Sequence, residues 1–100
     1  MQITLVLGIL KDKDVREMVR IVSSFAHNII VTQPPSERAL PVACLAAEVR
    51  KHTQSVWEEA CPRKALDLAF SLTDGIIICA GSLYLVGAIR KTIQEEDSLD

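Results

Sequence analysis

The sequence predicts an α/β fold: a three-layer, mostly parallel, Rossmann-like sheet of about four strands with helices on both faces. Three observations lead to this prediction. Apolar runs of strand length alternate along the chain with segments whose apolar residues recur at helical spacing. Prolines stand at the ends of these segments rather than inside them. The last apolar run, residues 74–80, passes through Gly81 and Ser82 directly into another helical pattern, as strands of such sheets do.

The first half of the chain contains two strand–helix units. Residues 3–7 form the first apolar run, and residues 28–32 form the second, which closes at Pro34 and Pro35 because proline cannot continue a sheet. Between them, residues 12–26 predict a helix with one apolar face made of Val15, Met18, Val19, Val22 and Phe25. A second helix has Pro41 in its first turn and an apolar face made of Val42, Leu45, Ala46 and Val49.

The second half predicts two further units. Residues 55–57 are the only strand material available after the second helix, so we expect a short edge strand there. A third helix starts near Pro62, and its expected core face consists of Ala65, Leu66, Ala69 and Phe70. The fourth strand is residues 74–80. In the helix expected after it, the core-facing residues are expected to be Val86, Ile89 and Ile93. Right-handed crossovers imply a parallel sheet covered on both faces, and among the orders that this leaves open we expect 3-2-1-4.

Composition limits the classes of function. The 100 residues make one domain, residues 1–100, with 49% apolar but only 4% aromatic residues. A net charge of −2 argues against a nucleic-acid or membrane-surface partner, and no apolar run has the length of a membrane helix. The three cysteines lack a CxxC pair, so we expect Cys44 and Cys79 to be small buried hydrophobes, no metal site, and a reducing, cytoplasmic location.

Several common chemistries are excluded by missing motifs. The chain has no GxxxxGK[ST] segment for a triphosphate and no GxGxxG after the first strand, where Gly8 stands alone. His27 and His52 have no Ser, Cys or Asp at a suggestive spacing, so we expect them at the surface or at strand ends. No catalytic residue is therefore predicted in this chain by itself.

Polar residues follow three of the predicted strands, at the edge where α/β sheets bind ligands. They are Lys11, Asp12, Lys13 and Asp14 after the first strand, Thr32, Gln33, Ser36 and Arg38 after the second, and Ser82 after the fourth. Cationic side chains and a serine at a helix N-terminus suit an anionic small molecule. The alternative for Ser82 is that it only caps the helix, and for the others that they are solvated loop residues.

Three segments carry a resemblance to a known family. Residues 5–14 (LVLGILKDKD), 31–40 (VTQPPSERAL) and 81–90 (GSLYLVGAIR) resemble the carboxyl-terminal domain of the folylpolyglutamate synthase/dihydrofolate synthase family, in the Mur ligase superfamily. The resemblance covers nearly the whole chain in the expected order. It implies an ATP-dependent amide ligase that uses ATP and Mg²⁺ to join L-glutamate to a folate or pteroate through an acyl phosphate.

The resemblance also implies roles for particular residues. Ser82 matches the serine of the family's Gly-Ser motif and is expected to contact glutamate, and Lys13 matches the lysine of the turn after the first strand. Secondary candidates are Asp12, which with Asp14 is more easily explained as a helix cap, and Thr32 and Arg38. The last two occupy a loop where relatives carry Asp-Asn-Pro-Arg, whereas this chain has Gln-Pro-Pro-Ser.

The family's Asp-Gly-Ala-His-Asn-Pro segment, P-loop and magnesium ligands are absent from these 100 residues. We therefore expect the chain to be a truncated part of a larger enzyme, inactive and without a cofactor when alone, and monomeric. Two alternatives stay open at this point. One is a stand-alone α/β module that binds a small anion, and the other is a domain of a different Mur-type ligase, acting on a peptidoglycan precursor.

Overall fold

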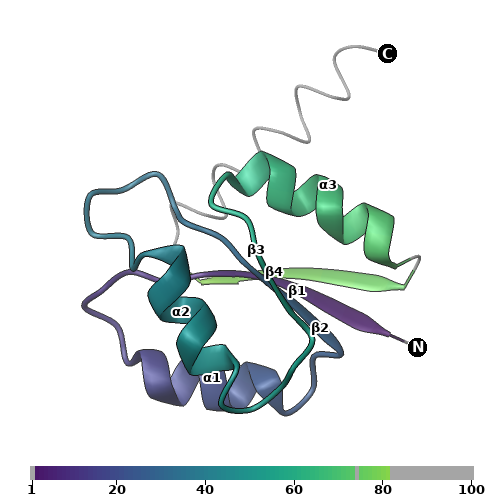
Figure 1. Cartoon of the computed structure of the whole chain (residues 1–100), viewed down its shortest axis with the longest axis horizontal. Coiled ribbons are helices and arrows are strands. Elements are labelled where there is room, and N and C mark those ends of the chain that lie inside the picture. Colours follow the sequence, from purple (N-terminus) through teal and green to yellow (C-terminus); the bar gives the residue numbers. More distant parts are fainter. Residues whose placement is uncertain (1, 74, 82–100) are drawn as a thin grey trace.

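The computed structural model describes residues 2–73 and 75–81, which form a four-stranded sheet between two layers of helices (Figure 1). Within these residues the elements follow in the order β1 (Ile3–Gly8), α1 (Val15–Ser23), β2 (Asn28–Val31), α2 (Val42–Val49), β3 (Val56–Glu58), α3 (Pro62–Leu72) and β4 (Ile76–Gly81). The predicted helix after the fourth strand lies outside the described residues. None of the described helices is long and apolar enough to cross a membrane.

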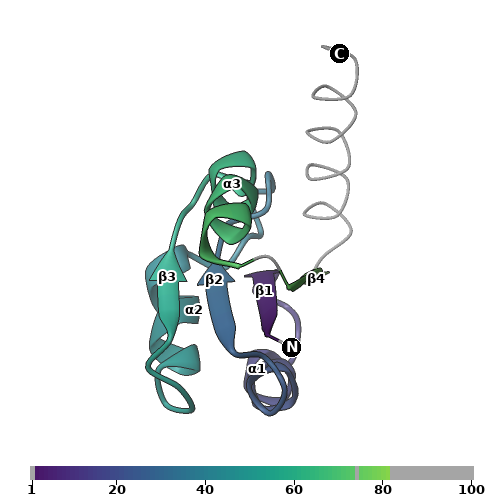
Figure 2. The ribbon, with the colours of Figure 1, turned by 90° about the vertical axis from the view of Figure 1, so that its right-hand side faces the viewer.

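The strand order is β3-β2-β1-β4, as the sequence predicts, and each neighbouring pair is parallel (Figure 2). The register of the central pairs aligns Leu5 with Ile29 on one side and with Ile78 on the other. All strand carboxyl ends consequently lie at the same edge of the sheet. The short third strand is at one border of the sheet, as expected, and β4 is at the other.

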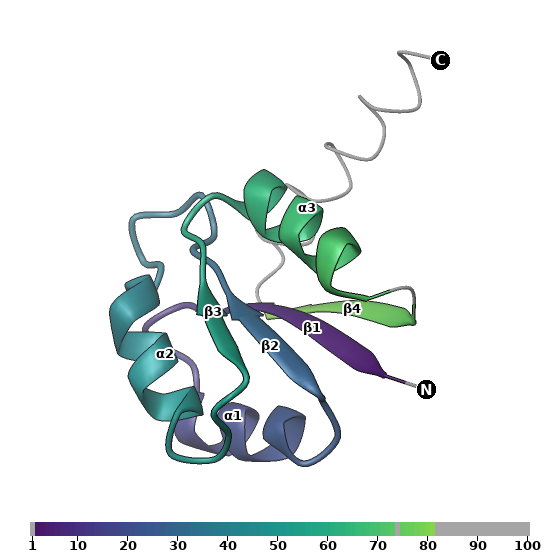
Figure 3. The same ribbon diagram turned by 45° about the vertical axis from the view of Figure 1, so that its right-hand side comes forward.

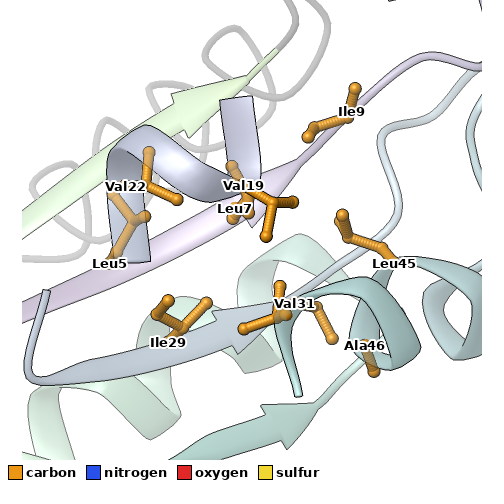
Figure 4. Packing of buried hydrophobic residues seen from close by; sticks show 10 residues of the cluster. Leu5, Leu7, Ile9, Val19, Val22, Ile29, Val31, Leu45 and Ala46 are labelled. Atoms are coloured by element: carbon orange, nitrogen blue, oxygen red, sulfur yellow. The ribbon is translucent and has the colours of Figure 1, made fainter. Parts of the chain in front are cut away.

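Two helices cover one face of the sheet and one helix covers the opposite face (Figure 3). The core on the side of α1 and α2 is built only from aliphatic side chains (Figure 4). Its fully or almost fully buried members are Leu5, Leu7, Ile9, Val19, Val22, Ile29, Val31, Leu45, Ala46 and Val49. Burying a Val, Leu or Ile side chain stabilises a fold by roughly 1.5–3 kcal/mol, so this cluster is the main stabilising unit.

The smaller core lies beneath α3. It joins Val6 and Ile30 of the sheet to three small or aliphatic residues of the helix, which are Ala65, Leu66 and Ala69. Alanine at two of these helix positions lets α3 approach the sheet closely. Alternate residues of β1 thus contribute to opposite cores, because successive strand side chains point to opposite faces.

The element ends follow local sequence signals. The side chain of Asp14 caps α1 by accepting a hydrogen bond from the Glu17 N–H (3.2 Å), so the helix begins at residue 15 rather than at residue 12. Pro62 takes the first position of α3, as predicted. Pro41 precedes α2 as its N-cap and does not stand in its first turn.

Three burial predictions are wrong. Phe25 follows the end of α1 and is 41% exposed, and Phe70 is 58% exposed although it stands next to the core-facing residues of α3. Cys44 is exposed on α2, because the core face of this short helix is taken by Leu45, Ala46 and Val49. Cys79 is partly buried in β4, closer to the expectation.

Candidate functional site at the carboxyl edge of the sheet

The strand order reverses between β1 and β4. The chain proceeds from β1 outward to β2 and β3, then returns across the sheet through α3 to place β4 on the free side of β1. In open α/β sheets, ligands bind outside the carboxyl ends of the strands at such a reversal point. The fold therefore marks the ends of β1 and β4 as the candidate binding site.

The two strands end level with each other, since Gly8 of β1 is paired in register with Gly81 of β4. Ser82 is the next residue along the chain from Gly81 and lies outside the described residues. The described part of the fold thus brings the chain to the reversal point immediately before the serine that the sequence singles out.

Lys13 is exposed in the turn that connects β1 to α1. Its N–H donates to the Leu10 carbonyl (3.2 Å), and its own carbonyl accepts from the Val15 N–H (2.9 Å). The main chain at Lys13 is therefore held at both peptide groups while the side chain is free to reach solvent. Asp12 is exposed in the same turn, and neither its side chain nor that of Lys13 has a hydrogen bond among those found for the described residues.

A main-chain bridge joins this turn to the loop after β2. Leu10 and Ala39 form an isolated antiparallel bridge. The Lys11 N–H donates to the Arg38 carbonyl (2.8 Å), and the Leu40 N–H donates to the Ile9 carbonyl (2.9 Å). The exposed Arg38 is consequently brought to the same side of the sheet edge as Lys11, 27 residues earlier in the chain.

Unlike Lys13 and Arg38, Thr32 is buried. Its side chain is fully buried, its hydroxyl donates to the Ala60 carbonyl (3.1 Å), and its N–H donates to the Leu7 carbonyl (2.8 Å). The Gln33 N–H also donates to the Ala60 carbonyl (3.2 Å). Thr32 thus joins the loops after β2 and β3, and it presents no hydroxyl to a ligand at the surface.

The described side chains of this edge suit electrostatic binding better than acid–base chemistry. Lys11, Lys13 and Arg38 supply cationic groups on two connected loops, which can attract a carboxylate or a phosphate. Among residues 2–73 and 75–81, no three His, Cys, Asp or Glu side chains come together to hold a metal ion. The same two loops also carry the exposed carboxylates Asp12, Asp14 and Glu37, so an anion would be attracted by individual cationic side chains rather than by a net positive charge.

Two features of the edge were not foreseen from the sequence. The bridge between residues 9–11 and 38–40 consists of main-chain hydrogen bonds and leaves no side-chain signature. Glu59 accepts a hydrogen bond from the Cys61 N–H (3.0 Å) immediately before α3. Glutamate two residues before the N-cap of a helix is a weak local signal that could have pointed to this contact.

Comparison with known proteins gives one curated relative and several solved structures, although no protein-family model matches the chain. The chain is 36% identical over 92 residues to the folylpolyglutamate synthase of Lacticaseibacillus casei, an alignment that covers 91% of this chain and 21% of that protein. The resemblance inferred from the sequence is confirmed by this similarity.

The fold is shared with solved folylpolyglutamate synthases. The Mycobacterium tuberculosis enzyme, complexed with ADP and AMPPCP, matches with a TM-score of 0.81 and 29% identity over 90% of this chain and 23% of its own. The Thermotoga maritima enzyme gives a TM-score of 0.81 and 29% identity over 93% of this chain and 21% of its own. The chain therefore spans about a fifth of the length of the relatives it matches.

Proposed function

We propose that this chain, similar in sequence and fold to folylpolyglutamate synthases, acts as the carboxyl-terminal domain of an ATP-dependent ligase that joins L-glutamate to a folate or pteroate. The observation that carries the proposal is the 36% identity spread over 91% of the chain. An alignment of 92 residues is longer than the helices and strands of the described chain together, so the likeness extends beyond these elements.

The proposed reaction has two steps. A carboxylate oxygen of the folate or pteroate attacks the γ-phosphorus of ATP, and the bond to the β-phosphate oxygen breaks to give an acyl phosphate and ADP. The amine of glutamate then attacks the acyl carbon, inorganic phosphate leaves, and the nitrogen loses a proton as the amide forms. We propose that the carboxyl-terminal domain closes over the bound nucleotide, and such a domain can position the amine and keep water from the acyl phosphate.

In this scheme Lys13 and Ser82 hold the incoming glutamate. The ammonium group of Lys13 attracts a carboxylate, and its backbone is already held by Leu10 and Val15, so binding has to immobilise the side chain but not the turn. Ser82 donates a hydroxyl hydrogen bond from the end of β4. Arg38 is a secondary contact because the bridge to Lys11 brings its loop to the same edge. We assign no contact with glutamate to Thr32, which is buried.

The chemistry of phosphoryl transfer belongs to other parts of such a ligase in this proposal. The described residues include no carboxylate cluster suited to Mg²⁺, and the sequence has no P-loop. We assign ATP and Mg²⁺ to the longer enzyme and expect the 100-residue chain by itself to be catalytically silent. A cytoplasmic location and a monomeric state are further parts of the proposal.

A domain exchange tests the proposal. Residues 1–100 would replace the aligned segment of the Lacticaseibacillus casei synthase, and incorporation of labelled glutamate into a reduced folate would be measured. We expect the kcat/KM of ATP-dependent ligation to stay within about tenfold of that of the parent enzyme. A tenfold decrease corresponds to a loss of about 1.4 kcal/mol in transition-state stabilisation. A folded chimera that binds nucleotide but forms no glutamyl amide would contradict the proposal.

The binding-module alternative has its own measurement. Calorimetric titration of the 100-residue chain with glutamate and with inorganic phosphate would show micromolar affinity if the edge were a complete site. We expect no such affinity, because a site made by one edge of a sheet leaves most of a ligand's surface in water.

A further inference from the structure

The loop between β2 and α2, residues 32–41, is held at both ends (Figure 3). At its start the Thr32 hydroxyl donates a hydrogen bond to the Ala60 carbonyl (3.1 Å). At its end the Leu40 N–H donates to the Ile9 carbonyl (2.9 Å). The loop is therefore tied to the β3–α3 connection on one side and to the β1–α1 connection on the other.

The interior of this loop has hydrogen bonds of its own. The Ser36 N–H donates to the Pro34 carbonyl (2.8 Å), and the Ser36 carbonyl accepts from the Ala39 N–H (3.1 Å). The Ser36 hydroxyl accepts from the Arg38 N–H (3.1 Å). Pro34 and Ala39 are buried, and each of the two adjacent prolines has a fixed φ angle. Few backbone dihedrals are left free, so a displacement at the start of the loop is carried on to Arg38.

The tie at the start of the loop includes a side chain, whereas the bridge at its end uses main-chain groups. Thr32 is fully buried, and its hydroxyl shares the Ala60 carbonyl with the Gln33 N–H (3.2 Å). A carbonyl oxygen has two lone pairs, and these two donors use both of them. Loss of the hydroxyl would leave the start of the loop on one hydrogen bond to Ala60 instead of two.

The connection to which Thr32 is tied is itself fixed. The Glu59 N–H donates to the Val31 carbonyl (2.9 Å) and so extends the pairing of β2 with β3 by one residue. The Glu59 carboxylate accepts from the Cys61 N–H (3.0 Å), and α3 begins at the next residue, Pro62. The Thr32 hydroxyl thus joins the loop to a segment that is held by the sheet and by α3.

We propose that Thr32 is a positioning residue for the anion-binding edge. Its hydroxyl sets the place of the β2–α2 loop, and through the bridge this loop sets the place of Arg38 relative to the turn that carries Lys13. The proposal rests on the proposed ligase function and adds to it a buried residue that determines affinity for glutamate without touching it.

The mixture of charges on the two loops makes such positioning matter. Glutamate has two carboxylates, and the side chains of Lys13 and Arg38 supply one cation from each loop. The exposed carboxylates of Asp12 and Glu37 stand next to these cations in the chain. A shift of one loop against the other would bring a repelling charge toward a carboxylate of the ligand, so a loop already in place favours binding.

Thr4 provides a matched control. It is the other fully buried threonine of the described chain, and its hydroxyl accepts a hydrogen bond from the Asn28 side-chain amide (3.2 Å) near the amino end of the sheet. Thr4→Val and Thr32→Val therefore each remove one buried hydroxyl and one hydrogen bond, but only Thr32 lies at the carboxyl edge. Thr32→Ser keeps the hydroxyl and removes the methyl group.

The three variants would be compared in the chimeric synthase that carries residues 1–100. We expect Thr32→Val to raise the KM for glutamate about three- to tenfold, the factor that corresponds to one net hydrogen bond, with kcat and the KM for ATP within about twofold of the parent. Thr32→Ser and Thr4→Val should keep the parent KM for glutamate. A parent KM in Thr32→Val would overturn the proposal, and so would equal increases in Thr32→Val and Thr4→Val or in Thr32→Val and Thr32→Ser.

Hydrogen exchange on the 100-residue chain separates this proposal from the ligase function. The Lys11 and Leu40 amides form the two hydrogen bonds of the bridge, and their exchange reports how often it opens. We expect both amides to exchange at least about fivefold faster in Thr32→Val than in Thr4→Val or the parent. Unchanged exchange would overturn the positioning role even if the chimera were active. A chimera without ligase activity would contradict the proposed function, while faster exchange in Thr32→Val alone would still support the tie between Thr32 and the bridge.

Discussion

Ile3 exchanges two hydrogen bonds with His27, and one of them ends on the imidazole ring rather than on the main chain. The Ile3 N–H donates to Nδ1 of His27 (2.9 Å), while the His27 N–H donates to the Ile3 carbonyl (2.8 Å). The imidazole thus takes the place of a main-chain acceptor, and the two hydrogen bonds join the amino end of β1 to the residue that precedes β2.

Replacing His27 by alanine should lower the free energy of unfolding by about 1 kcal/mol, the usual net value of one hydrogen bond. Urea unfolding followed by circular dichroism measures the change. His27→Asn is the matched control, because its amide oxygen can accept the same Ile3 N–H. An alanine variant as stable as the parent would show that water replaces the imidazole without cost.

The cap of α1 gives a second prediction. Asp14→Ala removes the acceptor of the Glu17 N–H and should cost about 0.5–2 kcal/mol, whereas Asp14→Asn should retain most of the stability. The nearby exposed Asp12 serves as a comparison position, so Asp12→Ala should leave the midpoint of unfolding nearly unchanged. Equal losses at both positions would point to a general charge effect rather than to a cap.

Gly75 lies against the N-terminal backbone. A Cβ atom at this position would stand 2.4 Å from the carbonyl oxygen of Gln2, and that same oxygen accepts the Ile76 N–H (3.1 Å). Gly75→Ala must therefore displace the start of β4 from β1, with an expected cost of about 1–3 kcal/mol, as for other overpacked sites. A thermal midpoint within one degree of the parent would contradict this close approach.

Alkaline pH should destabilise the chain partly through Cys79. Burial raises the pKa of the Cys79 thiol, so the folded state keeps its proton at pH values where the unfolded chain loses it. The stability contribution is fully present below the pKa of an exposed thiol, about 8.5, and is lost as pH rises through the higher folded value. Urea unfolding at pH 7 and pH 9.5 should show a smaller decrease for Cys79→Ala than for the parent.

The chimeric synthase that carries residues 1–100 also tests the two residues proposed to hold glutamate. Lys13→Ala or Ser82→Ala should raise the KM for glutamate or lower kcat, while leaving nucleotide binding unchanged, because both residues are proposed to hold the amino acid. Removing one hydrogen bond to a charged group is worth about 1.5–3 kcal/mol, equivalent to roughly 10- to 150-fold in kcat/KM. Normal kinetics with a lower thermal midpoint for Ser82→Ala would identify this serine as a helix cap only.

Much of the fold could be predicted because its signals are local. Proline at the start of α3 and the alternation of strand and helix periods indicated the order of elements, and the crossover rule indicated a parallel sheet, whereas the strand order itself had no local signal. The exposure of Phe25 and Phe70 could not be predicted in this way. A hydrophobic pattern indicates which side chains favour burial, whereas actual burial depends on what packs against the flanks of each helix.

The candidate site was only partly predictable for a related reason. Lys13 and Arg38 could be assigned to one edge from topology alone, and the structure places their loops there. The burial of Thr32 was not foreseen, because it depends on the path of the loop around Ala60, 28 residues later in the chain. Contacts of that kind have no periodic signature.

The bridge between Leu10 and Ala39 has a consequence for how this edge can vary. Its hydrogen bonds use main-chain groups only, so most substitutions of the exposed Arg38 leave it intact, whereas the buried Ala39 has little room for a larger side chain and proline at Leu40 would remove the bonded N–H. A change in the number of residues between Pro34 and Ala39 would instead shift one loop against the other and move the turn that carries Lys13. Natural variation at this edge should therefore be permissive at the exposed positions and strict in loop length.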